Sequence, residues 1–146
     1  MCRKFETRDT DALERLLSQL GYRVPAGAIE KRVADLRTGA GEVFVKELDG
    51  MVVGCVNAIV DTRIAAGLHG EIASLVVLDG YRGRGICKAL VLHVEAWLAI
   101  RIRANIVREQ AHQFYQHVGY REAKTQKVFF KEVRNIANNV VGRNQE

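Results

Sequence analysis

The spacing of hydrophobic residues in the first forty positions is that of two amphipathic helices. Leucines at every third or fourth position predict the first helix, which an aspartate can cap and Gly21 ends. The second helix is predicted between Pro25, which suits a first helical turn, and Gly39 just beyond its end. Weak alternation over residues 2–8 predicts a short strand ahead of both. The leucines of the first stripe are Leu13, Leu16, Leu17 and Leu20.

The middle of the chain changes to the pattern of strands. Residues 42–48 and 51–61 read as two strands joined by Asp49 and Gly50, a strong hairpin signal. Residues 62–70, with two glycines, are predicted to form a loop. The run 72–78 is apolar throughout, which is typical of a central strand covered on both faces.

The last third of the chain alternates between helical and strand patterns. A long helix is predicted after residue 85, a strand over 100–106, a short helix over 110–118 ended by Gly119, and a last strand over 125–133. Residues 134–146 are polar and predicted to be a tail. The predicted order is therefore β-α-α-β-β-β-α-β-α-β. The apolar stripe of the long helix holds Ile86, Ala89, Leu90, His93, Val94, Trp97 and Leu98, with His93 and Trp97 expected in the core.

Composition limits the class of protein. A chain of 146 residues with 48% hydrophobic residues and one proline suits one globular domain. No apolar run approaches the roughly 20 residues that cross a bilayer, and the charged N-terminus lacks a secretory core. We therefore expect a cytoplasmic protein with no membrane partner. The three cysteines are widely spaced and match neither a disulfide framework nor a metal site, and His112 and His117 lack acidic ligands at metal spacing, so no metal is expected.

The net charge of +5 raises the question of nucleic-acid binding. Lysine and arginine are scattered among 17 acidic residues, and no motif with stacking aromatics or a recognition helix is present. We expect no specific nucleic-acid partner. A basic surface also suits a ligand that carries several phosphate charges.

The most informative segment is the turn between the apolar strand and the long helix, Arg82-Gly83-Arg84-Gly85-Ile86-Cys87. Glycines allow the backbone to approach a ligand closely, and the free N–H groups of a helix start attract anions. The turn lacks the Gly-Lys-Ser/Thr ending of a nucleotide P-loop and the three glycines of a dinucleotide fingerprint. The segment predicts a site for a phosphate-bearing ligand of another kind.

Besides the glycine turn, two further segments are informative: residues 75–77 at the end of the apolar strand, and Ala111-His112-Gln113-Phe114-Tyr115-Gln116-His117-Val118-Gly119-Tyr120. Together with the element order, the three segments resemble the GNAT superfamily of acetyl-CoA-dependent N-acetyltransferases. The glycine turn resembles the family's diphosphate loop, residues 75–77 resemble the strand that exposes its backbone to the pantetheine arm, and the third segment resembles a late family signature. The resemblance implies an α/β (α+β) fold over 1–133, in which helices flank a mixed, mostly antiparallel sheet.

The resemblance also implies a set of residues that bind acetyl-CoA, the acetyl donor. It leaves open whether Asn105 or Arg108 contacts the cofactor, because the family has asparagine where this chain has Arg108. Cys87 replaces the family's small residue; a thiol at a helix start can have a lowered pKa, but packing is the favoured role. The implied cofactor-binding residues are Leu75, Val76, Val77, Arg82, Gly83, Arg84, Gly85, Ile86, Cys87, Lys88, Asn105 and Arg108.

Acetyl transfer to an amine needs a base, because an alkyl ammonium with a pKa near 10 is protonated at neutral pH. By the resemblance, Glu71 is the candidate base, with Glu42 and Asp61 in reserve, and Tyr115 is the candidate acid for the departing thiolate. Backbone N–H groups at Val76 or Val77 would stabilise the oxyanion.

The predicted function is direct transfer of an acetyl group from acetyl-CoA to an amine in a ternary complex. The acceptor is the amine of a small molecule or of a protein. The alternative is a catalytically silent module that binds acyl-CoA as a sensor or partner. Homodimers are common among such small domains, and the sequence does not decide the oligomeric state.

Overall fold

The computed structural model describes residues 1–65, 67–97, 101–102 and 116–123. The chain divides into two compact units, Met1–Arg103 and Ala104–Glu146. In the second unit, residues 116–117 are helical and Gly119 has a φ of +100°, as expected for a residue that ends a helix. The predicted strand over 125–133 and the tail over 134–146 lie outside the described residues.

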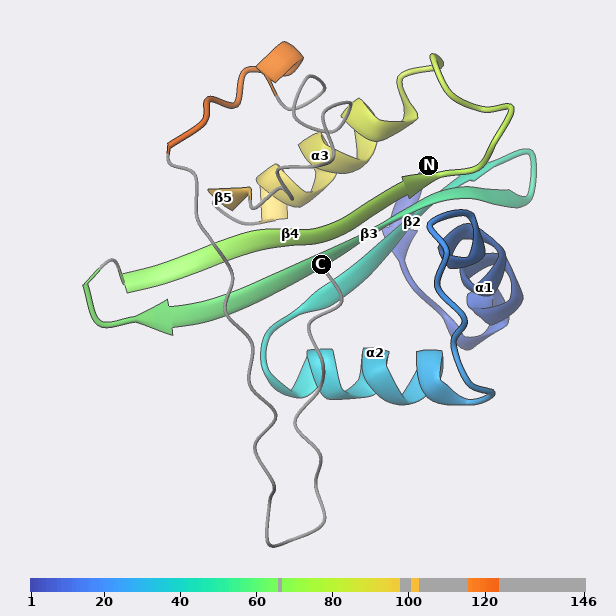
Figure 1. Ribbon diagram of the computed structural model, residues 1–146, viewed down its shortest axis with the longest axis horizontal. Helices are drawn as coiled ribbons and strands as arrows, with labels where there is room; N and C mark the ends of the chain where they lie inside the picture. The colour runs from blue at the N-terminus through green and yellow to red at the C-terminus, as the bar shows by residue number, and fades with distance from the viewer. Residues whose placement is uncertain (66, 98–100, 103–115, 124–146) are drawn as a thin grey trace, which may run out of the picture. The chain divides into compact units, whose positions relative to one another are not determined.

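Within its described residues, the first unit forms a five-stranded sheet with helices on both faces (Figure 1). The strand order is β1-β2-β3-β4-β5; only the pair of β4 and β5 is parallel, and the other pairs are antiparallel. The predicted mixed, mostly antiparallel sheet is therefore confirmed. The elements are β1 (Cys2–Lys4), the 3-10 helix η1 (Thr7–Asp9), α1 (Thr10–Gln19), α2 (Ala28–Thr38), β2 (Glu42–Leu48), β3 (Met51–Arg63), β4 (Gly67–Val77), α3 (Ile86–Trp97) and β5 (Arg101–Ile102).

Alternation along β3 decides which helices lie on which face. Cys55 belongs to the core cluster that contains the buried leucines of α1 and Ile29 and Val33 of α2. Gly54, its neighbour, lies against Ile86 and Leu90 of α3. Because successive residues of a strand point to opposite faces, α1 and α2 cover one face and α3 the other, as Figure 1 shows.

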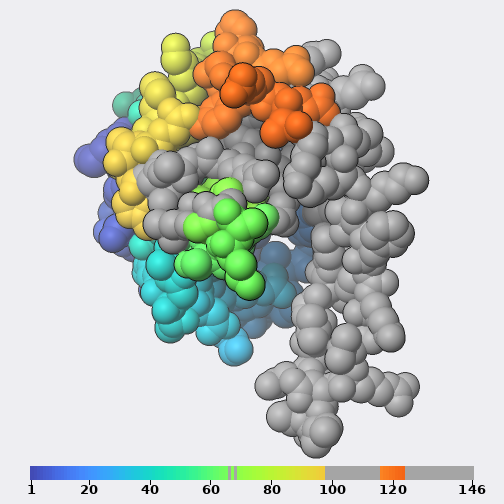
Figure 2. Space-filling model, turned by 90° about the vertical axis from the view of Figure 1, so that its left-hand side faces the viewer, coloured from blue at the N-terminus to red at the C-terminus, as the bar shows by residue number. Residues whose placement is uncertain are grey.

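The predicted loop over 62–70 is wrong. Strand β3 continues to Arg63 and β4 begins at Gly67, and this end of their hairpin lies at the surface between α2 and α3 (Figure 2, green). The pairs Asp61↔His69 and Arg63↔Gly67 extend the ladder through polar residues. Backbone hydrogen bonds can pair two strands whatever their side chains are. The polar sequence therefore gave no hydrophobic alternation from which the strands could be predicted.

The long helix presents its aromatic residues to Phe44 of β2. The rings of His93 and Trp97 meet the ring of Phe44 edge to face, with centroids 4.8 and 5.2 Å apart. The expectation that Trp97 lies in the core is wrong, because this residue at the end of α3 is 39% exposed. Because Trp97 is the last residue of α3, only part of its indole packs on Phe44, and the rest is exposed to solvent.

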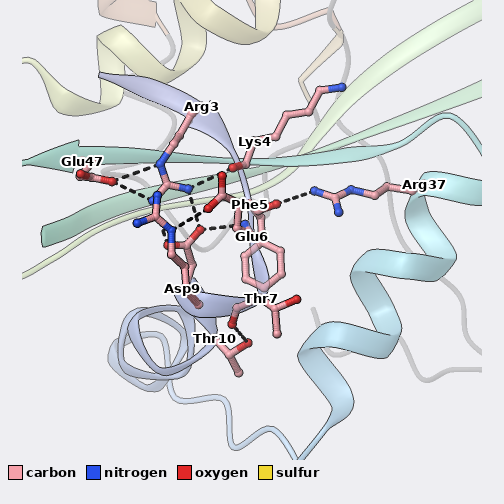
Figure 3. A network of polar contacts seen from close by, with 10 residues as sticks. Arg3, Lys4, Phe5, Glu6, Thr7, Asp9, Thr10, Arg37 and Glu47 are labelled. Carbon is pink, nitrogen blue, oxygen red and sulfur yellow. Dashed lines mark hydrogen bonds and ion pairs between the residues drawn. The ribbon is translucent and has the colours of Figure 1, made fainter. Parts of the chain in front are cut away.

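A charged network fastens the N-terminal strand to the fold (Figure 3). Arg3 donates two hydrogen bonds to Asp9, of 2.8 and 2.9 Å, and also pairs with Glu47 at 2.7 Å. Asp9, which is 4% exposed, accepts a further bond from the N–H of Glu6 at 2.8 Å. Burial alone would raise the pKa of Asp9, but the bonds from Arg3 and Glu6 outweigh it and lower that pKa.

In the part of the chain that the structure describes, no helix is both long and apolar enough to cross a membrane.

Candidate functional site

The turn between β4 and α3 has the backbone geometry of an anion site. Gly83 and Gly85 have φ values of +78° and +76°, which only glycine adopts without strain. The first helical hydrogen bond after them runs from the N–H of Ala89 to the C=O of Gly85, at 2.9 Å. The amides of residues 86–88 precede it and are therefore the ones that a helix start leaves for a ligand.

The surroundings of this turn are open and positively charged. A Cβ added at Gly83 or Gly85 would have no atom within 4 Å, so these glycines serve the backbone conformation and not close packing. Arg82 is 67% exposed and pairs with Asp79 at 3.2 Å. The guanidinium carbon of Arg84 lies 4.9 Å from the centre of the Tyr81 ring, a distance typical of a cation–π contact.

A third glycine, Gly54 in β3, determines how closely α3 approaches the sheet. A Cβ there would lie 3.0 Å from Cγ2 of Ile86, 3.1 Å from Cδ1 of Leu90 and 3.2 Å from the carbonyl oxygen of Val76. A side chain at this position would require its neighbours to give way by a few tenths of an ångström. The missing side chain at Gly54 thus places the first turn of α3, and with it the glycine turn, beside the end of β4.

Strand β4 contains a bulge next to the predicted pantetheine segment. Asn57 pairs with Ser74 and Ala58 pairs with Ile72, so Ala73 is an extra residue on β4. Within the described residues, β5 pairs with β4 only at Glu71 and Ile72, before the bulge. Bulges bend a strand and redirect the groups that follow it.

The register of β4 distinguishes the two candidates for the oxyanion donor. The N–H of Leu78 donates to the carbonyl of Val53 at 2.8 Å, one step beyond the last pair of the ladder, Gly54↔Val77. Because antiparallel strands alternate, Val76 also faces β3, whereas the N–H of Val77 points to the other edge. Of Val76 and Val77, only Val77 directs its amide away from the β3 ladder.

Burial is the main influence on the pKa of Cys87. It raises this pKa, and the nearby charge of Arg82 opposes the rise without cancelling it. A helix start can lower the pKa of a thiol, but at Cys87 the cost of burial is the larger effect. The packing role favoured for Cys87 stays a prediction.

The candidate base Glu71 lies on β4 opposite Ile59 of β3 and is 9% exposed. Its carboxylate pairs with Nη2 of Arg63, which also bonds the exposed Asp61 at 3.3 Å. Alternation along β3 places this group on the same face as Cys55, the face of α1 and α2. Glu71 is thus a buried carboxylate that pairs with Arg63.

The two reserve carboxylates have other surroundings. Glu42 is 5% exposed and pairs with Arg37 at 2.8 Å and Lys4 at 3.8 Å, so it links β2 to α2 and β1. Asp61 is exposed and bound only to Arg63 among the contacts of the described residues. The candidates Tyr115, Asn105 and Arg108 lie outside the described residues.

Three contributors to this region were not recognised in the sequence. Arg63 lay in a segment expected to be a loop, and Gly54 was one glycine in an apolar strand. Gln19 ends α1, and its carboxamide bonds the backbone of Val77 and Asp79 at 3.0 and 2.8 Å. Gln19 follows Leu13 and Leu16 at a spacing of three residues, which places it on the same face of the helix. A polar residue on that apolar face was a weak signal of its role.

Comparison with known proteins identifies the family. The model of the acetyltransferase (GNAT) family matches residues 10–120, which span both the glycine turn and the late signature. The chain belongs to the GNAT acetyltransferase family. It is therefore an acyltransferase, and the predicted enzyme class is confirmed.

Individual relatives support this membership. A glucosamine 6-phosphate N-acetyltransferase of Trypanosoma brucei brucei is 26% identical over 133 residues, covering 85% of this chain and 90% of the relative. An aminoglycoside 6'-N-acetyltransferase of Acinetobacter baumannii has a similar structure, with a TM-score of 0.77, 18% identity, and 92% and 99% of the two chains covered. An aminoglycoside N-acetyltransferase in complex with CoA gives a TM-score of 0.72 and 19% identity, with 92% and 100% covered.

Proposed function

We propose that this GNAT protein transfers the acetyl group of acetyl-CoA to the amino group of a small molecule. The observation that carries the proposal is the glycine turn before α3, where two glycines with positive φ precede the free amides of residues 86–88. These amides would bind the diphosphate, with Arg82 and Arg84 adding charge beside it. Membership of the family supports acetyl-CoA as the donor.

The rest of the donor would lie along the outer edge of β4. The pantetheine arm would bond to backbone groups of residues 75–77, in the way that an added strand bonds to a sheet edge. The amide of Val77, which points away from β3, is the proposed donor to the thioester oxygen. Asn105 or Arg108 would add a further contact to the cofactor. The proposed domain spans 1–133.

The chemistry moves two protons off the acceptor nitrogen and one onto the leaving sulfur. Glu71 would accept the first proton from the acceptor ammonium, directly or through a water molecule, and the free amine would attack the thioester carbon. Collapse of the tetrahedral intermediate breaks the C–S bond, Tyr115 would give its proton to the departing thiolate, and the nitrogen would give up its second proton, which restores the tyrosine. The buried carboxylate of Glu71, held by Arg63, supports its role as the base.

The acceptor is proposed to be a small amine such as an amino sugar. The support is that the curated relative is named for glucosamine 6-phosphate, and that two structural neighbours are named for aminoglycosides.

Titration calorimetry with coenzyme A, followed by an assay of acetyl-CoA consumption, tests the proposal. The acceptors to compare are glucosamine, glucosamine 6-phosphate, an aminoglycoside and a peptide with a free N-terminus. We expect micromolar coenzyme A binding and turnover with at least one amino sugar, with mass spectrometry showing one added acetyl group. Absence of coenzyme A binding would refute the donor, and turnover with the peptide alone would refute the acceptor class.

A further inference from the structure

The carboxamide of Gln19 joins the end of α1 to the end of β4. Its Nε2 donates to the carbonyl oxygen of Val77 at 3.0 Å, and its Oε1 accepts from the N–H of Asp79 at 2.8 Å. The two bonded residues lie 58 and 60 positions further along the chain. The donor and the acceptor of one carboxamide thus both bond the short stretch of backbone that precedes the glycine turn.

These two bonds reproduce the pairing of a parallel strand. In a parallel ladder, one residue donates to the carbonyl of residue i−1 and accepts from the N–H of residue i+1 on its neighbour. Gln19 does the same around Leu78, while Leu78 itself donates to Val53 of β3. Gln19 therefore occupies the outer edge of β4, the edge on which β5 pairs further back at Glu71 and Ile72.

The position of Gln19 is itself well determined. Gly21, with a φ of +90°, ends α1 through bonds from its N–H to Ser18 and from the N–H of Tyr22 to Leu17, which is the Schellman pattern. Leu16, one turn before Gln19, is fully buried in the cluster that also contains Val76 of β4. The helix can neither slide nor lengthen without breaking these contacts.

The end of β4 in turn orients the glycine turn. The N–H of Tyr81 bonds the carbonyl of Leu78 at 3.0 Å, and the side chain of Asp79 pairs with Arg82. Tyr81 is thus bonded to Leu78, which lies between the two residues that Gln19 contacts, and Arg82 is paired with Asp79, which is one of those two. A shift of Asp79 would move the first residues of the turn and the arginine next to Gly83.

We propose that Gln19 is a positioning residue for the acyl-CoA donor. By pairing with Val77 and Asp79, it closes the outer edge of β4 just beyond the amide of Val77 and holds the glycine turn ready for the diphosphate. Gln19 bonds the carbonyl of Val77 and not its amide. This inference rests on the proposed function, since it assumes coenzyme A at the glycine turn.

The test compares Gln19→Met, which keeps the length of the side chain without its polar groups, with the control Ser18→Ala at the exposed neighbouring position. Coenzyme A affinity is measured by calorimetry, far below the unfolding midpoint of each variant. We expect the Kd of Gln19→Met to rise roughly tenfold, as the loss of two ordinary hydrogen bonds would give. The kcat at saturating acetyl-CoA should stay within about twofold, because no reacting group is changed. Ser18→Ala should bind like the wild type.

A second variant, Gln19→Glu, keeps an acceptor for Asp79 and places an oxygen against the carbonyl of Val77. It should also bind coenzyme A more weakly, which keeps the proposal testable if Gln19→Met does not fold. An unchanged Kd in a folded variant would overturn the inference, because Gln19 would then serve stability alone. Tighter binding would also overturn it, because Gln19 would then compete with the donor. If the wild type binds no coenzyme A, the proposed function fails first.

Discussion

A substitution in the glycine turn should affect backbone conformation and coenzyme A binding separately. Gly85 has a φ of +76° and open space around its Cα, so a methyl group there strains the backbone without a clash. The same holds at Gly50, with a φ of +78°, in the hairpin turn between β2 and β3. The two positions thus form a natural pair in which only one belongs to the proposed site.

Gly85→Ala and Gly50→Ala should each lower the free energy of unfolding by about 1 kcal/mol, the usual cost of a left-handed residue with a side chain. Only Gly85→Ala should also weaken coenzyme A binding, by about tenfold or more, because the amides of residues 86–88 would no longer point in a common direction. Thermal unfolding and calorimetry on both variants measure the two effects. Equal coenzyme A affinity in the pair would contradict the assignment of the diphosphate to this turn.

The role of Glu71 is testable through the pH dependence of turnover. Glu71→Gln removes the base, so activity should fall about 100-fold at neutral pH, where nearly every acceptor amine is protonated. The loss should shrink as the pH rises toward the pKa of the amine, since free amine then no longer needs a base. The control is Glu14→Gln at an exposed position of α1. A loss that does not vary with pH would assign Glu71 to structure alone.

Among the elements, the N-terminal strand depends on a charged network more than on hydrophobic area. Strand β1 has three residues, and Arg3 binds it to Asp9 of η1 and to Glu47 of β2. The lowered pKa of Asp9 means that the folded state holds this carboxylate charged more strongly than the unfolded chain does. Asp9 therefore stabilises the fold above its ordinary pKa of 3.8, and this stabilisation is lost as the pH falls through the lower folded value.

Asp9→Asn should lower the free energy of unfolding by about 2 to 3 kcal/mol at pH 7, because it leaves a half-buried arginine with one partner fewer. The difference from the wild type should shrink below about pH 4 as Asp9 itself becomes protonated. Asp11→Asn, at an exposed position of the first turn of α1, is the matched control. Urea unfolding at several pH values measures the effect, and a pH-independent difference would argue against the charged pair as its cause.

For the whole molecule, the net charge of +5 should assist the capture of a ligand with several phosphates. The Kd for coenzyme A should therefore rise roughly 5- to 20-fold between low and high ionic strength, because salt screens exposed charges such as Arg82. S-acetylpantetheine lacks the phosphates of coenzyme A, so its binding should hardly change over the same range. Calorimetry in a series of sodium chloride concentrations measures both, and parallel curves would exclude a phosphate contribution.

Elements with strong local signals were predictable from the sequence. Leucine periodicity and Gly21 placed α1, and the Asp49 and Gly50 turn placed the hairpin of β2 and β3, with Glu42–Leu48 correct to the residue. The end of the next hairpin was not predictable. Its strands there pair through polar residues such as Asp61 and His69, and backbone bonding leaves no hydrophobic pattern to read.

The glycine turn, the strand before it and the helix after it follow from local sequence, because positive φ, burial and amphipathicity each favour particular residue types at particular positions. The surroundings of that turn follow from the folding of the chain. Gln19 and Asp79 meet across 60 positions, Gly54 is small because α3 lies against it, and Arg63 holds Glu71 across a strand pair. Each of these residues is of a common type for its place in the sequence, so no local pattern indicates the contact. The contacts form only when the chain folds.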